Sequence, residues 1–491
     1  MRRLTTTNLL FSVAAAFALA AGAAPVRAQS PTSPPAAAPS TTGSAGVELS
    51  DTPYHVESIG LTVNLPVGSA IEETRIGGSS KGFRAKAKDN TWLLTFSIRN
   101  SRDLSLTADA VTESLIEGLL SRRTQRDAKT GRTVGSGTRI LNRERGLKID
   151  GRSADRFYAA IPRLDGGEIR TGYTIIHTAP GQFALFQIDT TEEAFETAKH
   201  ATETAIATAQ FRDPAVIASE RKAGLEAGDA FLTGLTADDF RAALSEEPIL
   251  YRVYRPAPNG APSDAEEVAF QFISVREGHR GELDPRKAKS RWAAIDQESG
   301  FVVSVYARAL SEGKVIESES VFFLREDRQS EAWAIRMIIK DGENEMDWTE
   351  TGVREDNDIK VTVDVPASTP IVKQWRKPAT GYCSQVELYM LPALLVHARA
   401  IDPMQFYYYQ TSGADIVLRS DRLDLARDSQ PSRPRWTLRS KKSEDATEDV
   451  ITLDGEGAVI RKQLGTGLVV TPTTREALDR LWRSKGLPPV G

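Results

Sequence analysis

The chain has 491 residues, 40% of them hydrophobic, and its 62 lysines and arginines against 66 aspartates and glutamates give a net charge of −4. Its charges are mixed along the whole length, whereas proteins that bind nucleic acid concentrate lysine and arginine where they contact phosphates. A single cysteine excludes an intrachain disulfide. Composition therefore argues against a nucleic-acid partner, and the length predicts two or three domains stabilised by core packing.

The first 28 residues are typical of an export signal. Arginines precede an apolar run from Leu9 to Ala24, and Val26 and Ala28 place small residues where a signal peptidase prefers them. Cleavage after Ala28 removes three arginines and no acidic residue, so the net charge changes from −4 to −7. No later segment is apolar for the ~20 residues of a spanning helix. The only cysteine lies far from the cleavage point, so we expect a periplasmic or secreted protein that is neither a lipoprotein nor a membrane-spanning one.

Residues 29–49 are rich in proline, alanine and serine and should form a disordered leader, because they cannot bury enough apolar surface to offset ordering. Patterned sequence follows in residues 50–212. Helix is predicted from Ala108 to Leu120, where apolar residues fall on one face. A second helix is predicted in 191–211, opening with Thr191 as its cap and an acidic first turn. Strands are predicted at 55–66, 91–100, 146–163, 169–179 and 181–190.

That order, with "GLTVNLP", the "GRSADRFYA" hairpin and a closing helix that ends in "AQFRDP", resembles the α/β/α sandwich of the PsbP family and its bacterial relatives. The resemblance covers about residues 50–212. It implies an exported or lumenal protein with a binding or assembly role, and it assigns no residue a function. A fold of this kind does not by itself fix an activity.

Residues 213–246 read as a helical connection, with helices starting at Pro214 and after a cap at Thr236. From residue 247 to 491 the sequence changes to long strands with short polar turns, one apolar helical insert and a C-terminal helix at 473–486. This pattern, over about residues 245–485, resembles the half-barrel of the LolA/LolB lipoprotein carriers, which implies a curved sheet with an apolar groove for acyl chains. The predicted fold class is α+β, with an N-terminal sandwich and a large curved antiparallel sheet.

The insert, "GYCSQVELYMLPALLVHARA" at 381–400, holds the single cysteine. If it forms one helix, Cys383 and His397 lie roughly 21 Å apart, too far for a thiol–imidazole pair. A break at Pro392 could fold the two halves together and keeps that alternative open. The nearly continuous apolar lining predicts instead a buried helix that fills the curved sheet.

An aromatic run at 406–409 follows the insert. In a strand, Phe406 and Tyr408 share one face while Tyr407 and Tyr409 share the other, so one pair can pack inward and the other can contact a ligand or partner. Cross-strand aromatic packing is the competing interpretation. The residues predicted to line a ligand groove are Tyr389, Met390, Leu394, His397, Phe406 and Tyr408.

Other motifs have structural explanations. Residues 78–82 fit Gly-x-Ser-x-Gly, but a strand-like segment follows where a nucleophile elbow needs a helix. The alternating acids of 341–347 lack the glycine and glutamate of an EF-hand, so we predict a solvated turn that could collect only a loosely held cation. The five histidines never pair at ligand spacing, and no phosphate loop is complete. No metal site and no cofactor are predicted.

The sequence thus favours an exported, non-catalytic protein of the cell envelope with a binding or assembly role, holding an apolar ligand or lipid in a half-barrel groove or contacting an envelope protein. Two alternatives stay open. One is an envelope hydrolase whose catalytic residues are dispersed along the chain, and the other is a purely structural module for protein–protein interaction.

Overall fold

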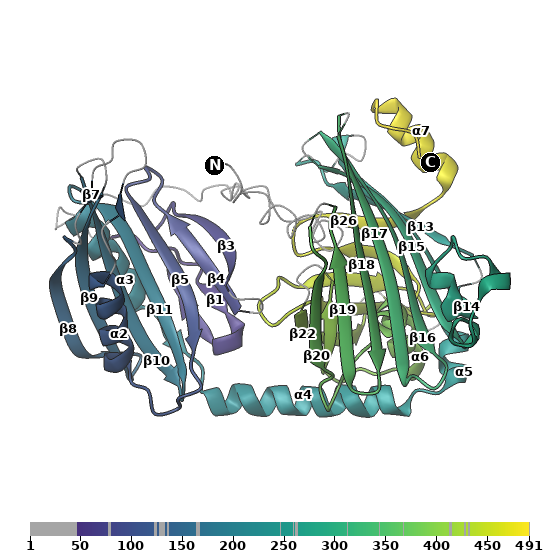
Figure 1. The fold of residues 1–491 in the computed structure, drawn as a ribbon, viewed down its shortest axis with the longest axis horizontal. Helices are drawn as coiled ribbons and strands as arrows, with labels where there is room; N and C mark the ends of the chain where they lie inside the picture. The colour runs from purple at the N-terminus through teal and green to yellow at the C-terminus, as the bar shows by residue number, and fades with distance from the viewer. Residues whose placement is uncertain are drawn as a thin grey trace. The chain divides into compact units, whose positions relative to one another are not determined.

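The computed structural model describes residues 47–490 except 77–79, 122–124, 127–132, 135–136, 164–166, 246, 259, 261–263, 312, 343, 367, 412–414, 427–428 and 431–432. The chain divides into two compact units, one ending at Glu220 and one starting at Arg221, and the division falls within helix α4 (Pro214–Gly234) (Figure 1). The expected signal peptide and most of the expected leader lie outside the described residues.

The N-terminal unit contains a seven-stranded antiparallel sheet in the order β3-β4-β5-β11-β10-β9-β8 and a small sheet in the order β1-β2-β12. Its strands are β1 (Tyr54–Val56), β2 (Leu61–Val63), β3 (Ala70–Ile76), β4 (Ser80–Lys86), β5 (Trp92–Asn100), β6 (Gln125–Arg126), β7 (Thr133–Val134), β8 (Arg139–Ile149), β9 (Arg152–Pro162), β10 (Glu168–Ala179), β11 (Gln182–Thr191) and β12 (Gln210–Phe211).

Helices α2 (Ala108–Leu120) and α3 (Phe195–Ala207) cover opposite faces of the seven-stranded sheet. Consecutive residues of β9 show this, because Phe157 packs in a cluster with Val111 of α2 whereas Tyr158 packs in a cluster with Ala198 of α3. Side chains alternate between the two faces of a strand, so both faces are buried. The unit is therefore an α/β/α sandwich, as expected from the sequence.

Helix α3 starts later than the sequence predicts. The Thr191 hydroxyl accepts a hydrogen bond from the backbone N–H of Ala194 at 3.4 Å, which closes a turn, and the helix begins at Phe195 with Ala194 in the cap position. Threonine hydroxyls form such local turns as readily as helix caps, and the two are hard to distinguish from sequence.

The C-terminal unit is dominated by one 14-stranded antiparallel sheet in the order β20-β19-β18-β17-β16-β15-β14-β13-β26-β25-β24-β23-β22-β21, much of which is visible in Figure 1. Its strands are β13 (Ile249–Arg255), β14 (Glu266–His279), β15 (Ser299–Ser311), β16 (Lys314–Arg325), β17 (Ser330–Asp341), β18 (Asn344–Glu355), β19 (Asp358–Asp364), β20 (Ile371–Arg376), β21 (Met404–Gln410), β22 (Asp415–Leu425), β23 (Trp436–Lys441), β24 (Asp449–Leu453), β25 (Val459–Gln463) and β26 (Val469–Thr473). The predicted α+β class with a large curved antiparallel sheet is confirmed.

The two edge strands of this sheet, β20 and β21, are consecutive in the chain, and helix α6 (Gln385–Ala398) lies between them in sequence. Residues 381–383 pair with β21, because Cys383 N–H donates to Tyr407 O and Tyr407 N–H donates to Gly381 O, each at 2.8 Å. Met390 and Leu394 of α6 belong to the main core cluster together with residues of β13 to β19. The sheet therefore curves around its own helix, which fills the interior.

Shorter helices complete the C-terminal unit. Helix α5 (Ala237–Ala242) begins at the capping box predicted from Thr236, and α7 (Arg475–Ser484) buries Trp482 against Phe270. Between β14 and β15 lie three 3-10 turns, η3 (Arg280–Leu283), η4 (Lys289–Arg291) and η5 (Ala294–Gln297), which the sequence did not indicate. A further 3-10 turn, η1 (Glu57–Ile59), lies in the N-terminal unit.

Candidate functional site

Helix α6 is continuous through Pro392. Cys383 precedes its first turn and His397 lies in its last turn, so the two candidates for a catalytic pair are at opposite ends of the helix. Cys383 is 0% exposed, and burial raises the pKa of its thiol well above the ordinary value. His397 Nε2 instead lies 3.8 Å from Glu456 Oε2. The structure does not bring the pair together, and the thiol stays protonated at neutral pH.

Most of the predicted groove residues belong to the core. Met390, Leu394, Phe406 and Tyr408 are 2%, 1%, 0% and 7% exposed. Tyr409, on the other face of β21, is also fully buried, so both faces of the aromatic run are covered. Tyr389 is 37% exposed and contacts the ring of Phe322, while His397 is at the surface end of α6. An apolar ligand among these side chains stays a prediction, since it would have to displace packed core.

The first turn of α6 is fixed by its own capping box. The Ser384 hydroxyl accepts from Glu387 N–H at 3.2 Å, and the Glu387 carboxylate accepts from Ser384 N–H at 2.6 Å. The same carboxylate pairs with Arg328 at 2.6 Å, and Arg328 also donates to the carbonyl of Leu235 at the end of α4. A buried charge thus links α4, α6 and the β16–β17 turn.

A second buried carboxylate holds the residues just before α6. Glu331, 1% exposed, accepts from the Tyr382 hydroxyl at 2.5 Å, from Gln385 N–H at 3.2 Å and from Arg354 at 3.2 Å. Burial raises the pKa of Glu331, while Arg354 and Tyr382 oppose that shift. Since a buried carboxylate is tolerated only when paired and hydrogen-bonded, this arrangement anchors the helix to β17 and β18.

A third buried carboxylate, Glu350 of β18, faces β21. Its Oε1 accepts from Trp333 Nε1 at 2.9 Å, and the hydroxyl of Tyr409 lies beside the same carboxyl. Burial raises the pKa of Glu350 to about 7, and the Tyr409 hydroxyl opposes that rise. Tyr409 also contacts the rings of Trp333 and Trp375, with centroids 5.0 and 5.6 Å apart. This group therefore titrates near neutral pH inside the core where the two edges of the sheet meet.

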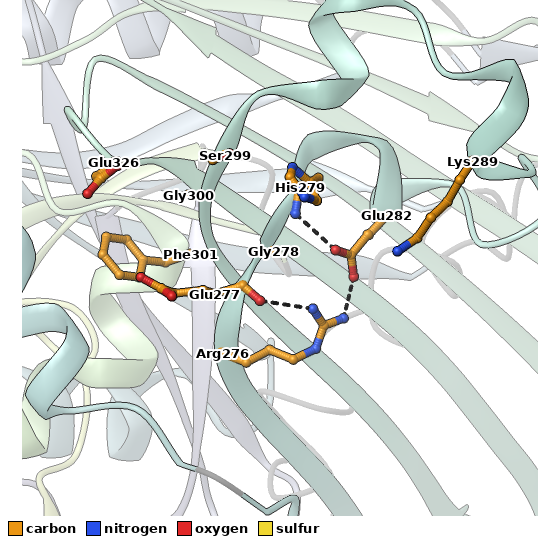
Figure 2. Close-up of a pocket in the computed structure, with 10 residues that line it drawn as sticks. All are labelled: Arg276, Glu277, Gly278, His279, Glu282, Lys289, Ser299, Gly300, Phe301 and Glu326. Carbon is orange, nitrogen blue, oxygen red and sulfur yellow. Dashed lines mark hydrogen bonds and ion pairs between the residues drawn. The ribbon is translucent and has the colours of Figure 1, made fainter.

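A polar pocket of about 440 Å³ lies at the ends of β14 and β15 (Figure 2). Its lining residues come from β14, β15, the 3-10 turns and the β16–β17 turn: Arg276, Glu277, Gly278, His279, Glu282, Lys289, Ser299, Gly300, Phe301 and Glu326. Seven of these ten residues carry a charged or hydrogen-bonding side chain. A polar or charged ligand would suit this pocket, whereas an acyl chain would not.

The basic side of the pocket is organised around Glu282. Figure 2 shows Arg276 and Lys289 extending toward this carboxylate, with Arg276 paired to it and His279 N–H donating to it at 2.9 Å. Although partial burial works against it, Arg276 holds the pKa of Glu282 below its ordinary value. A Cβ at Gly278 would lie 2.7 Å from Glu282 Oε1, so a larger residue at this position would displace that carboxylate.

The acidic side of the pocket is held by Arg241 of α5. This arginine pairs with Oε1 of Glu277 at 2.7 Å and with Oε1 of Glu326. Among the described residues, the other carboxylate oxygen of Glu277 and of Glu326 forms no hydrogen bond or ion pair. Figure 2 shows these two acids on the opposite side of the view from Lys289. The pocket thus presents acceptors at one side and cations at the other.

The structure does not support a functional site at the Gly-x-Ser-x-Gly match or at the acidic stretch 341–347. Gly78 and Ser79 of the Gly-x-Ser-x-Gly match, and Glu343 of the acidic stretch, lie outside the described residues. Asp341 pairs with Lys314 and Asp347 pairs with Arg336, which fits a polar strand turn. Within the described ranges, no group of three or more His, Cys, Asp and Glu side chains is arranged to hold a metal ion.

Sequence reasoning missed the pocket because none of its residues forms a motif. They converge from segments that are separated in sequence by up to fifty residues, from Arg276 to Glu326. The one available signal was the connection between β14 and β15, which has 19 residues from Arg280 to Glu298. Connections of this length in a strand meander are uncommon and often functional.

No family model and no curated protein matches the chain. The solved structures include a cyanobacterial PsbP from Synechocystis sp. PCC 6803, 18% identical, with a TM-score of 0.25, covering 35% of this chain and 98% of that one. A β-barrel-like protein of a domain of unknown function from Brucella abortus is 8% identical, with a TM-score of 0.31, covering 46% and 95%. LpqN of Mycobacterium tuberculosis, involved in cell envelope biogenesis, is 13% identical, with a TM-score of 0.21, covering 34% and 92%.

At these identities and TM-scores the likenesses carry no argument about activity or partners. The PsbP resemblance stated from the sequence has a counterpart among the solved structures. No LolA or LolB is among the three, and that resemblance stays a prediction. In the part of the chain that the structure describes, no helix combines the length and apolarity needed to cross a bilayer.

Proposed function

We propose that the chain is an exported, non-catalytic protein of the cell envelope with a binding or assembly role, and that the polar pocket of its C-terminal unit is the ligand site. The observation that supports this most strongly is the arrangement of charge in the pocket. Glu277 and Glu326 are held in place by Arg241, and Arg276 by Glu282, so the pocket is preorganised before any ligand arrives. Preorganised charges reduce the cost of binding.

The ligand class follows from the two sides of the pocket. Carboxylate oxygens of Glu277 and Glu326 would accept hydrogen bonds from an ammonium group, while Lys289 would pair with a phosphate or carboxylate. A small zwitterion carries both groups. Phosphoethanolamine is a suitable probe because it has an ammonium and a phosphate on one short chain.

The test is calorimetric titration of phosphoethanolamine into the wild-type protein and into Glu277→Gln/Glu326→Gln. Loss of both carboxylates should weaken binding by at least about ten-fold, the magnitude of one charge-assisted hydrogen bond. Glu319→Gln/Glu345→Gln changes net charge equally at exposed positions of the same sheet and should bind like wild type. Equal weakening in both variants, or no binding to wild type, would refute this site.

A second candidate is carriage of an apolar ligand or lipid inside the sheet. It is favoured by the apolar cluster around α6, which includes Met390 and Leu394. Because these side chains are packed in the core, lipid binding inside the sheet requires an acyl chain to displace α6. Organic extraction of the purified protein followed by mass spectrometry tests this directly. An acyl lipid present in equal amount to the protein would support carriage, and a lipid-free protein would remove it.

A further inference from the structure

The connection between β14 and β15, residues 280–298, is an ordered loop that exposes both basic and apolar side chains. It is held in a defined shape, because Asp296 pairs with Lys287 at 2.5 Å and also accepts from Ala293 N–H at 2.7 Å. Trp292 Nε1 donates to the carbonyl of Lys287 at 3.3 Å, and the indole ring lies against Gly281, where a Cβ would be 2.6 Å away. An ordered loop presents its side chains at lower entropic cost than a flexible one.

Three exposed cations of this loop form no ion pair in the described part of the chain, although Lys289 extends toward the carboxylate of Glu282. Arg286, Lys289 and Arg291 are exposed, and none of them forms an ion pair within the described residues. The other two basic residues are neutralised, since Arg280 pairs with Glu298 at 3.2 Å and Lys287 pairs with Asp296. Residues 280–298 hold five basic and four acidic residues, so this loop carries a net charge of +1 in a chain whose net charge is −4.

The same loop exposes apolar surface. Ile295 is 47% exposed, and Trp292 is half-buried beside Lys289, whose amine lies 5.6 Å from the centre of the indole ring. Free cations next to an exposed aliphatic side chain and a tryptophan form the combination that favours the boundary between lipid headgroups and acyl chains. A soluble polyanion would use the cations and would gain nothing from Ile295.

We propose that residues 286–295 form a docking surface for a lipid bilayer that carries anionic headgroups. Arg286 and Arg291 contact the phosphates, and Ile295 enters the headgroup boundary. This contact is separate from ligand binding in the pocket, which uses Lys289. It is weak and reversible, since two cations and one apolar side chain are far fewer than a stable anchor requires.

The test measures co-sedimentation of residues 29–491 with vesicles of phosphatidylcholine alone and of phosphatidylcholine with an equal part of phosphatidylglycerol. Each cation near an anionic surface contributes about a five-fold gain in partitioning, so Arg286→Gln/Arg291→Gln should lose roughly thirty-fold on anionic vesicles. Lys360→Gln/Arg461→Gln removes two exposed cations elsewhere in the same unit and should bind like wild type. Both variants leave Lys289 and the pocket intact.

Three results would overturn the proposal: no binding to anionic vesicles, equal loss in the loop variant and the control, or capture of soluble polyphosphate with no vesicle binding. The Ile295→Ser variant tests the apolar contribution to vesicle binding separately from the electrostatic one. It should weaken vesicle binding at high salt, where the electrostatic part is screened, whereas unchanged binding there would refute the insertion of this side chain. Phosphoethanolamine titration of the loop variant separates this surface from the pocket, since it should match wild type.

Discussion

Replacing Glu350 with glutamine tests whether the ionised form of this buried carboxyl destabilises the folded protein. Burial raises its pKa to about 7 from an ordinary value of 4.5. A carboxyl whose pKa is raised on folding binds its proton more tightly in the native state. Its destabilising effect is therefore absent below about pH 4.5, grows as pH rises, and is complete once pH exceeds the folded pKa.

The magnitude follows from that difference. A shift from 4.5 to about 7 corresponds to about 3 kcal/mol of unfolding free energy at about 1.4 kcal/mol per pKa unit. Glutamine keeps an oxygen to accept from Trp333 Nε1 and cannot ionise. The Glu350→Gln variant should thus be about 1 kcal/mol more stable than wild type at pH 5, and this difference should rise to about 3 kcal/mol at pH 8.

The assay is urea unfolding at several pH values, followed through tryptophan fluorescence, with Glu345→Gln on the same strand as the control. Trp333 lies against Glu350 and reports on this part of the core. The stability difference between variant and wild type should rise with pH, and the control should show no such trend. A difference that is constant from pH 5 to pH 8 would contradict the raised pKa.

Cys383 should resist alkylation in the native protein even at mildly alkaline pH and react fully after denaturation, because burial raises its pKa well above the ordinary value; rapid labelling of folded protein would show an accessible thiol. Gly228→Ala should lower the unfolding free energy of the C-terminal unit by about 1–3 kcal/mol, since its Cβ would lie 2.3 Å from a backbone carbonyl of β21. Gly234→Ala, at an open position of the same helix, should not, and equal effects would refute the close contact. Arg354→Ala should cost about 3–5 kcal/mol by leaving Glu331 buried without its cation; a cost under 1 kcal/mol in chemical denaturation would mean that the pair is solvated.

The sequence predicted those parts of the fold in which apolar residues keep a strict period. Helix α2 matches its predicted bounds from Ala108 to Leu120, and most of the long strands of the C-terminal sheet were predicted from strand-like segments separated by short polar turns. In the two large sheets, strands β3, β20 and β26 and the part of β8 before residue 146 were not predicted. Strands β3, β8 and β20 lie at sheet edges, and the residues of β8 and β20 are largely exposed, so these two carry little of the apolar alternation on which strand prediction depends.

The candidate site was less accessible to sequence reasoning. Helix α6 was correctly predicted as a buried segment, because apolar side chains lie on nearly all sides of the helix. Whether a groove stays open beside it depends on packing, which periodicity does not report. The polar pocket depends on Arg241, Glu277 and Glu326 meeting in space, and three charged residues far apart in sequence look like ordinary solvated surface.

The measurement that tests the central claim most directly is the titration of phosphoethanolamine into wild type and Glu277→Gln/Glu326→Gln, with the bound lipid content of the same samples determined by mass spectrometry. We expect one site in wild type, weakened in the variant, in protein that is free of acyl lipid. Equal affinity in both proteins, together with an acyl lipid in equal amount to the chain, would contradict the account and move the ligand site from the pocket to the interior around α6.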